Sequence, residues 1–206
     1  MAAKGVETMI NGKVGVFGRN DERAGAHGHG PVLLSGALQT DSGLFPVGLL
    51  LSRLADGVLA PLAVVVDAVI ATGNGSTKAY STTLGTAPIE PGTVSISDGV
   101  ESFHDDGHGR LIGDAGGSGV IDYGTATLAM EFAANVVSAT EVLADYTTAI
   151  DGVLDDLADT AMVSAANYIV HGTVRREVLK VGVASPVAPS AALLMRLQKR
   201  GIYAVG

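Results

Sequence analysis

The sequence contains no cysteine and no tryptophan, and aromatic residues make up only 4% of its 206 residues. The lack of cysteine excludes disulfides, thiolate catalysis and cysteine-based zinc sites. Long apolar runs are missing as well: the most apolar stretch, residues 58–71, contains Asp67 and is shorter than the about 20 residues of a membrane-spanning helix. The N-terminus has no apolar signal segment. We therefore expect a protein that is made in a cytoplasm and has no membrane partner.

Basic residues are scarce: 13 Lys and Arg stand against 21 Asp and Glu, for a net charge of −8. Such a chain lacks the cationic surface that binds phosphate backbones, so we expect no nucleic-acid partner. The acids are concentrated in residues 67–159, where fifteen acids face only Lys78 and Arg110, net −13. The flanking residues 1–66 and 160–206 carry net charges of 0 and +5. This partition predicts an acidic module inserted into a neutral to basic remainder.

Glycine is abundant at 28 residues, but with 7 prolines the two types stay below the about 25–30% that is typical of disordered chains. The acidic middle has strand patterns separated by turn signals. Residues 93–97 and 125–132 alternate between apolar and polar side chains, and residues 105–109 form an Asp- and Gly-rich turn. Short strands at this spacing predict an inserted antiparallel β-sandwich of the Ig-like type.

The flanking regions also read as strands. Residues 45–51 and 58–63 predict two strands joined by a turn at residues 55–57, and Pro61 favours an edge position for the second strand. Residues 167–179 predict either a strand pair or one long bent strand. Near the end, Ser190 is a candidate N-cap for a helix over residues 191–200, with Gly201 after it.

The predicted fold class is therefore mainly β. A small β-rich base with one C-terminal helix comprises residues 31–68 and 142–206, the sandwich module occupies residues 69–141, and residues 1–30 form an extended N-terminal arm.

The densest set of possible metal ligands is His104, Asp105, Asp106 and His108. A calcium loop needs acids at alternate positions and a closing Glu, whereas two adjacent aspartates before glycine are typical of a β-turn. His171 has no nucleophile near it in the sequence. We therefore expect no enzyme, no cofactor and no metal. A small metal-assisted hydrolase that uses these four residues is the enzymatic alternative, and bound metal in the purified protein would favour it.

Four segments, in their order along the chain, carry a resemblance to a known family. They are residues 43–62, Asp151-Gly-Val-Leu154, the segment Asn167-Tyr-Ile-Val-His-Gly-Thr-Val-Arg-Arg-Glu-Val-Leu179, and the ending at residues 191–204 with Arg200-Gly-Ile-Tyr-Ala204. Together they resemble the head decoration, or capsid cement, proteins of lambda-type phages. The chain departs from the compact members of this family in the interval of about eighty residues between the two halves, which resembles a β-module that recurs in phage virion proteins.

The resemblance implies a structural protein on the outer capsid surface of a virion. Its partners would be the major capsid protein and two further copies of itself, in a homotrimer at three-fold positions that stabilises the expanded shell. We expect an arm that adds a strand to an exposed edge of the shell. Contacts with the capsid or within the trimer are expected at Val14, Val16, Phe17, His171, Thr173, Arg175 and Arg176.

A second function remains open at the level of the sequence. The inserted sandwich is also typical of an adhesin that binds a glycan or protein on the host surface, although fold alone does not imply function. Few aromatic side chains in the insertion are available to stack on sugars. The two functions are compatible, with one in each module.

Overall fold

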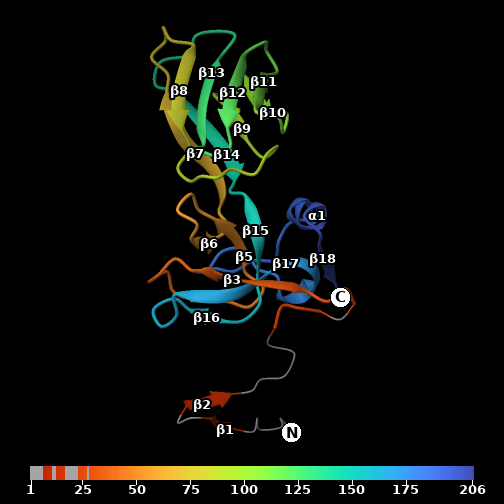
Figure 1. Cartoon of the computed structure of the whole chain (residues 1–206). Coiled ribbons are helices and arrows are strands. Elements are labelled where there is room, and N and C mark those ends of the chain that lie inside the picture. Colours follow the sequence, from red (N-terminus) through yellow and green to blue (C-terminus); the bar gives the residue numbers. More distant parts are fainter. Residues whose placement is uncertain (1–6, 11–12, 17–22, 27) are drawn as a thin grey trace.

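The computed structural model describes residues 7–10, 13–16, 23–26 and 28–206. Strands make up 48% of the chain and helical segments 7%, which confirms the expected mainly β class. Figure 1 shows two bodies joined by a narrow neck. We call residues 64–147 the barrel module, and residues 23–26, 28–63 and 148–206 the base. Each body has its own hydrophobic clusters: one lies within the barrel module and two lie within the base.

The base is built on a six-stranded sheet with the order β18-β17-β15-β5-β6, in which β3 also pairs with β17. The strands are β3 (Val32–Ala37), β5 (Leu50–Arg53), β6 (Leu59–Pro61), β15 (Ile150–Leu154), β17 (Ala165–Arg175) and β18 (Ile202–Val205). The short strands β4 (Leu44–Phe45) and β16 (Ala158–Asp159) pair with each other. The long strand β17 organises the base, because β3 and β15 pair with its first half and β18 with its second half.

The barrel module is one antiparallel sheet with the strand order β7-β14-β9-β10-β11-β12-β13-β8. Its strands are β7 (Val64–Thr72), β8 (Ala79–Thr83), β9 (Ser95–Ser97), β10 (Ser102–Asp105), β11 (Arg110–Gly113), β12 (Ser118–Asp122), β13 (Thr127–Glu131) and β14 (Glu141–Thr147). The sheet curls toward a closed barrel around a single apolar core (Figure 1). The expected Ig-like sandwich is not confirmed, because hydrogen bonds run without interruption through all eight strands.

Alternating side chains explain why the barrel has an apolar interior. In β13, Leu128 and Met130 are buried while the residues between and beside them are exposed. Two fully buried rings fill the centre: Phe103 and Phe132 meet edge to face with ring centroids 4.9 Å apart. The turns are tight, and several place glycine or a small residue at positive φ.

The predicted C-terminal helix is confirmed as α1 (Ala191–Lys199). The Ser190 hydroxyl accepts a hydrogen bond from the Leu193 amide at 3.3 Å, as expected of an N-cap, and Gly201 follows the helix with a φ of 81°. Leu193 and Leu197 face the base core. Within the residues that the structure describes, no helix is long and apolar enough to cross a membrane.

The N-terminal strands β1 (Glu7–Ile10) and β2 (Lys13–Val16) form an antiparallel hairpin. Val14 and Val16 therefore belong to a strand whose partner comes from the same chain. Phe17, the third arm residue expected at an interface, lies outside the described residues. The extended arm expected over residues 1–30 is not confirmed.

Candidate functional site

The expected interface residue Thr173 lies beneath a segment that crosses β17. It is only 8% exposed, and its hydroxyl lies 3.0 Å from the Ala26 carbonyl oxygen and 2.9 Å from that of His29. Its backbone amide also donates to the His29 carbonyl, and its carbonyl accepts from the Ala26 amide. Thr173 therefore fastens this segment to β17 at Ala26 and His29 instead of forming an open contact surface.

The same segment is anchored by an ion pair at its start. Arg23 donates to the carboxylate of Asp155, which is 1% exposed and also accepts from the Gly25 amide at 3.2 Å. The hydrogen bond to Asp155 raises the pKa of Arg23, and burial raises the pKa of the neighbouring Asp156. A buried carboxylate held in this way is costly to leave without its cation, so the pair fixes where the chain enters the base.

His171 lies at the other end of this crossing. Its ring is half-buried and meets the ring of His29 edge to face, with centroids 4.8 Å apart. A Cβ on Gly201 would stand 2.5 Å from His171 Cδ2, so the turn after α1 requires glycine beside the imidazole. His171 thus fills the space between the crossing segment and the turn before β18.

The two arginines lie in different elements. β17 ends at Arg175, whose Nε pairs with Glu177 Oε1 at 3.1 Å, and Arg176 begins a short 3-10 helix, η2 (Arg176–Val178). The strand structure predicted over residues 167–179 therefore ends before Arg176. Arg176 is exposed and borders open hollows between η2, α1 and β18, with Leu194 and Tyr203 among their lining residues. Of the expected interface residues His171, Thr173, Arg175 and Arg176, only Arg176 is exposed in the described structure.

The structure adds an apolar surface that sequence reasoning missed. The consecutive residues Val32, Leu33 and Leu34 of β3 are 47%, 39% and 49% exposed. β17 is the one strand paired with β3 in the described part of the chain, so β3 presents an edge without charged residues. Such an edge invites another chain to pair with it unless something covers it. The only sequence signal was an apolar run, which a buried strand would share.

A loop at the opposite end of β3 from Val32 carries further exposed apolar residues. The Leu38 amide donates to the Ser164 carbonyl at 2.8 Å, which brings the loop before β17 against the end of β3. Leu157, Met162 and Val163 in and near this loop are 59%, 84% and 41% exposed. We call the exposed residues Val32, Leu33, Leu34, Leu157, Met162 and Val163 the apolar base face. In Figure 1, β3 and β16 lie on the side of the base away from the barrel module.

The possible metal ligands of the barrel do not converge. His104 is exposed on β10, whereas the carboxylate of Asp105 is directed into the neighbouring turns, where it accepts from Gly92 N at 2.6 Å and from the Tyr123 hydroxyl at 2.5 Å. Asp106 accepts from the amides of His108 and Arg110, and these bonds lower its pKa. Across the described residues, no group of three His, Asp or Glu side chains is arranged to hold a metal ion.

The hydroxyl of Tyr123 is part of the same turn network. It donates to Asp105 and accepts from the Gly109 amide at 2.9 Å. Burial, with the hydrogen bond to Asp105 in second place, raises the pKa of Tyr123 to about 12. The carboxylate of Asp105 thus holds these turns together, and its oxygens already accept hydrogen bonds from Gly92 and Tyr123.

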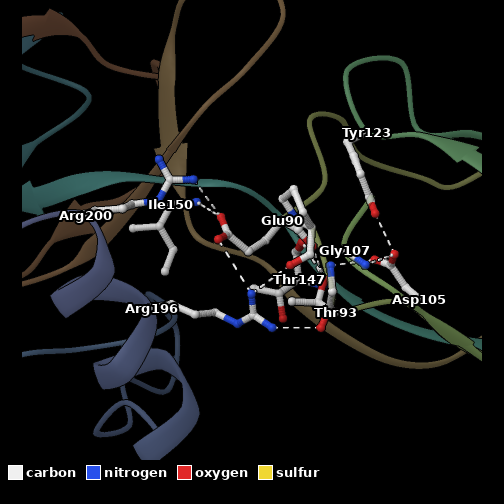
Figure 2. A network of polar contacts seen from close by, with 11 residues as sticks. Glu90, Thr93, Asp105, Gly107, Tyr123, Thr147, Ile150, Arg196 and Arg200 are labelled. Carbon is white, nitrogen blue, oxygen red and sulfur yellow. Dashed lines mark hydrogen bonds and ion pairs between the residues drawn. The ribbon is translucent and has the colours of Figure 1, made fainter. Parts of the chain in front are cut away.

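The most extensive polar contacts between the two bodies surround Glu90, in the loop between β8 and β9 (Figure 2). Its side chain is 10% exposed, and its Oε2 accepts from Arg200 Nη2 at 2.9 Å and from the Ile150 amide at 3.1 Å. Arg196 Nη1 lies 3.7 Å from the other carboxylate oxygen. No local pattern in the sequence indicates this cluster, because Arg200 lies 110 residues after Glu90 and Ile150 lies 60 residues after it.

Charge is divided between the two bodies in the same sense as between the linear blocks, but less sharply. The barrel module, residues 64–147, contains eleven acids against Lys78 and Arg110, net −9. The base acids are balanced by nearby arginines, as in the pairs Arg23–Asp155 and Arg53–Asp151. The described base is therefore close to neutral, and the acidity belongs to the barrel.

Comparisons with known proteins give no significant match: no family model, no curated protein and no solved structure.

Proposed function

We propose that this chain is a structural protein of a phage virion, which binds the outer surface of the capsid through its base and stabilises the expanded shell. In this proposal three copies assemble at a three-fold position, and the partners are the major capsid protein and the chain itself. The barrel module takes the place of the Ig-like insertion expected at residues 69–141, and in this proposal the residues before Arg23 act as an arm on the shell, because the segment from Arg23 is bound to the base. The short sequence resemblance to lambda-type decoration proteins supports this assignment.

The observation that carries the proposal is the apolar base face. Exposed apolar side chains on an uncharged edge strand mark a contact surface. Burying them stabilises a complex by about 25 cal/mol for each Å² of apolar area that is removed from water. This face belongs to the near-neutral base and not to the acidic barrel. Many copies that bind only the expanded shell would stabilise it by mass action.

A pair of matched variants tests this proposal. Leu34→Lys places a charge on the apolar base face, and Val120→Lys places one on the barrel, where Val120 is 59% exposed. We expect the first variant to lose at least tenfold in affinity for expanded capsids in co-sedimentation, and the second to bind like the wild type. Equal binding by both variants would rule out the apolar base face as the contact surface.

Two further measurements address the oligomer and the shell. Light scattering is expected to give a mass near three times 20.7 kDa. Particles without the protein are expected to lose their genome at lower temperature than particles that carry it. Equal thermal survival of the two kinds of particle would overturn the cement role even if the protein binds.

A second candidate function, binding to a host surface, rests on the far end of the barrel. There Val100 and Val137 are 79% and 62% exposed in neighbouring loops, which Glu101 ties together by accepting from the amides of Gly117 and Ala133. A rigid loop end with exposed apolar tips is suited to contact another molecule. Binding of the intact protein to host cells that is abolished by Val100→Asp, but retained by Leu34→Lys, would support this function.

A further inference from the structure

We infer that Arg196 of α1 and Arg200, the C-cap residue of α1, hold the barrel module against the base in one orientation, as a lock, through the Glu90 carboxylate and the Pro91 and Gly92 carbonyl groups. This inference concerns the isolated chain and goes beyond the proposed binding to a capsid.

The covalent neck between the two bodies is thin. The chain crosses it twice, after β6 and before β15, and the two crossings are joined by a hydrogen bond from the Thr148 amide to the Ala63 carbonyl at 3.0 Å. The Thr148 hydroxyl also lies 2.6 Å from that of Ser52 in the base sheet. A ribbon of two strands bends and twists readily, and motion between bodies is the default where their interface is small. The loop before β9 adds one backbone bond to this ribbon, from the Ala149 amide to the Pro88 carbonyl at 2.9 Å, and a fixed orientation gains further support outside the neck.

Helix α1 supplies that support from the side (Figure 2). Arg196 donates through Nη1 to the Pro91 carbonyl and through Nη2 to the Gly92 carbonyl, each at 2.8 Å. One helical turn later, Arg200 donates to Glu90. The planar fork of a guanidinium fixes direction as well as distance, so two such groups one turn apart resist rotation of the loop that they hold.

The loop that they hold is rigidly joined to the barrel. The Glu90 amide donates to the Thr147 carbonyl of β14 at 2.9 Å. Gly92 donates to Asp105 of β10, and Asp105 in turn accepts from Tyr123. Because these bonds reach separate parts of the barrel, the barrel must move together with the loop.

The base side of the lock is equally well fixed. Leu193 and Leu197 anchor α1 in the base core at 8% and 0% exposure. The Ile150 amide, which belongs to β15 of the base sheet, donates to the same Glu90 carboxylate that Arg200 holds. The carboxylate thus joins three parts: the barrel loop, the helix and the base sheet.

Distance measurements between two spin labels test the lock in solution. The chain has no cysteine, so Ser81→Cys in the barrel and Ser164→Cys in the base, both exposed positions, label the two bodies without further changes. Labelled chains are diluted with unlabelled protein, so that each distance comes from one molecule. We expect a narrow distribution for the otherwise unaltered chain, and one about twofold wider for the variant Arg196→Ala/Arg200→Ala.

Lys199→Ala is the matched control, because Lys199 is an exposed cation on the same helical turn. It should leave the distribution narrow. Circular dichroism and thermal melting establish that each variant is folded, and alanine at these helix positions favours α1 itself. The single substitution Glu90→Gln, which keeps the size of the side chain and removes its charge, should widen the distribution by an intermediate amount. A distribution as narrow in the double variant as in the control would overturn the lock.

Discussion

The separation of the hydrophobic clusters predicts that the two bodies unfold independently, and Phe103→Ala is the sharpest test of this. Phe103 is 1% exposed and lies in the barrel cluster, against Phe132. Removing a buried phenylalanine side chain costs about 3–5 kcal/mol, since apolar burial is lost and a cavity is left. The lost edge-to-face contact with Phe132 belongs to this cost and favours its upper half. None of the base clusters contains either residue.

The expected shift follows from the size of the barrel module. In a domain of about 60–100 residues, each kcal/mol changes the melting temperature by about 4–8 °C, so Phe103→Ala should lower the barrel transition by about 12 °C or more. Differential scanning calorimetry measures both transitions in one scan. The base transition should stay within about 2 °C of its original temperature, because the thin neck transmits little stabilisation.

The matched variant is Leu51→Ala, which removes a fully buried side chain from a base cluster. Its cost of about 2–5 kcal/mol should lower the base transition and spare the barrel. The reasoning would be refuted by one common transition that moves by the same amount in either variant. In that case the two clusters would form one cooperative unit, and the neck contacts would be stronger than their geometry indicates.

Three further predictions concern single contacts. Asp155→Asn weakens the hydrogen bond from Arg23 and should lower the stability of the base by about 1.5–3 kcal/mol, measured as a shift of the base transition alone. Ser190→Ala removes the N-cap of α1 and should cost about 1 kcal/mol in chemical denaturation, whereas the same change at exposed Ser185 should have no effect. Because the folded pKa of Tyr123 is raised above 10.0 to about 12, its contribution to stability is complete below pH 10 and is lost as the pH rises toward 12. Melting curves of the barrel between pH 9 and 12 should therefore fall less steeply in Tyr123→Phe than in the wild type, and parallel curves would contradict the assignment.

Local features of this fold were predictable because their causes are local. The turn at residues 55–57 joins β5 to β6, with the Leu54 amide donating to Val58, and β6 with Pro61 lies at the edge of its sheet as expected. The helix and its Ser190 cap were likewise visible in a few neighbouring residues. Residues 167–179 left two readings open, and the structure has one long strand over Ala165–Arg175 with a register shift between Ile169 and His171.

The arrangement of these elements was not predictable, because it depends on contacts between distant residues. β14 lies between β7 and β9, and no local pattern indicates that a late strand fills this position in the sheet. Closure of the sheet into a near-barrel, in place of a two-sheet sandwich, depends on the same pairing. The contact between Arg200 and Glu90 spans 110 residues. From the sequence alone, an arginine at this position is explained equally well by its favourable interaction with the C-terminal end of the helix dipole.

The position of the charges gives the two-body architecture a physical consequence for assembly. Acids of the barrel such as Asp98 and Asp122 accept hydrogen bonds from backbone amides in their own turns, so their negative charges stay uncompensated at the surface. Barrels of neighbouring copies therefore repel one another at separations up to a Debye length, about 8 Å at physiological salt. The base has no such surplus, so contacts through its apolar face meet no electrostatic opposition. If the barrels could rotate freely about the neck, they would move away from one another and the repulsion would not oppose assembly. Because Arg196 and Arg200 fix the orientation of each barrel, the repulsion instead raises the free energy of bringing two copies close together. Low salt should then weaken self-association of the chain. The self-association of the variant Arg196→Ala/Arg200→Ala should change less with salt concentration than that of Lys199→Ala.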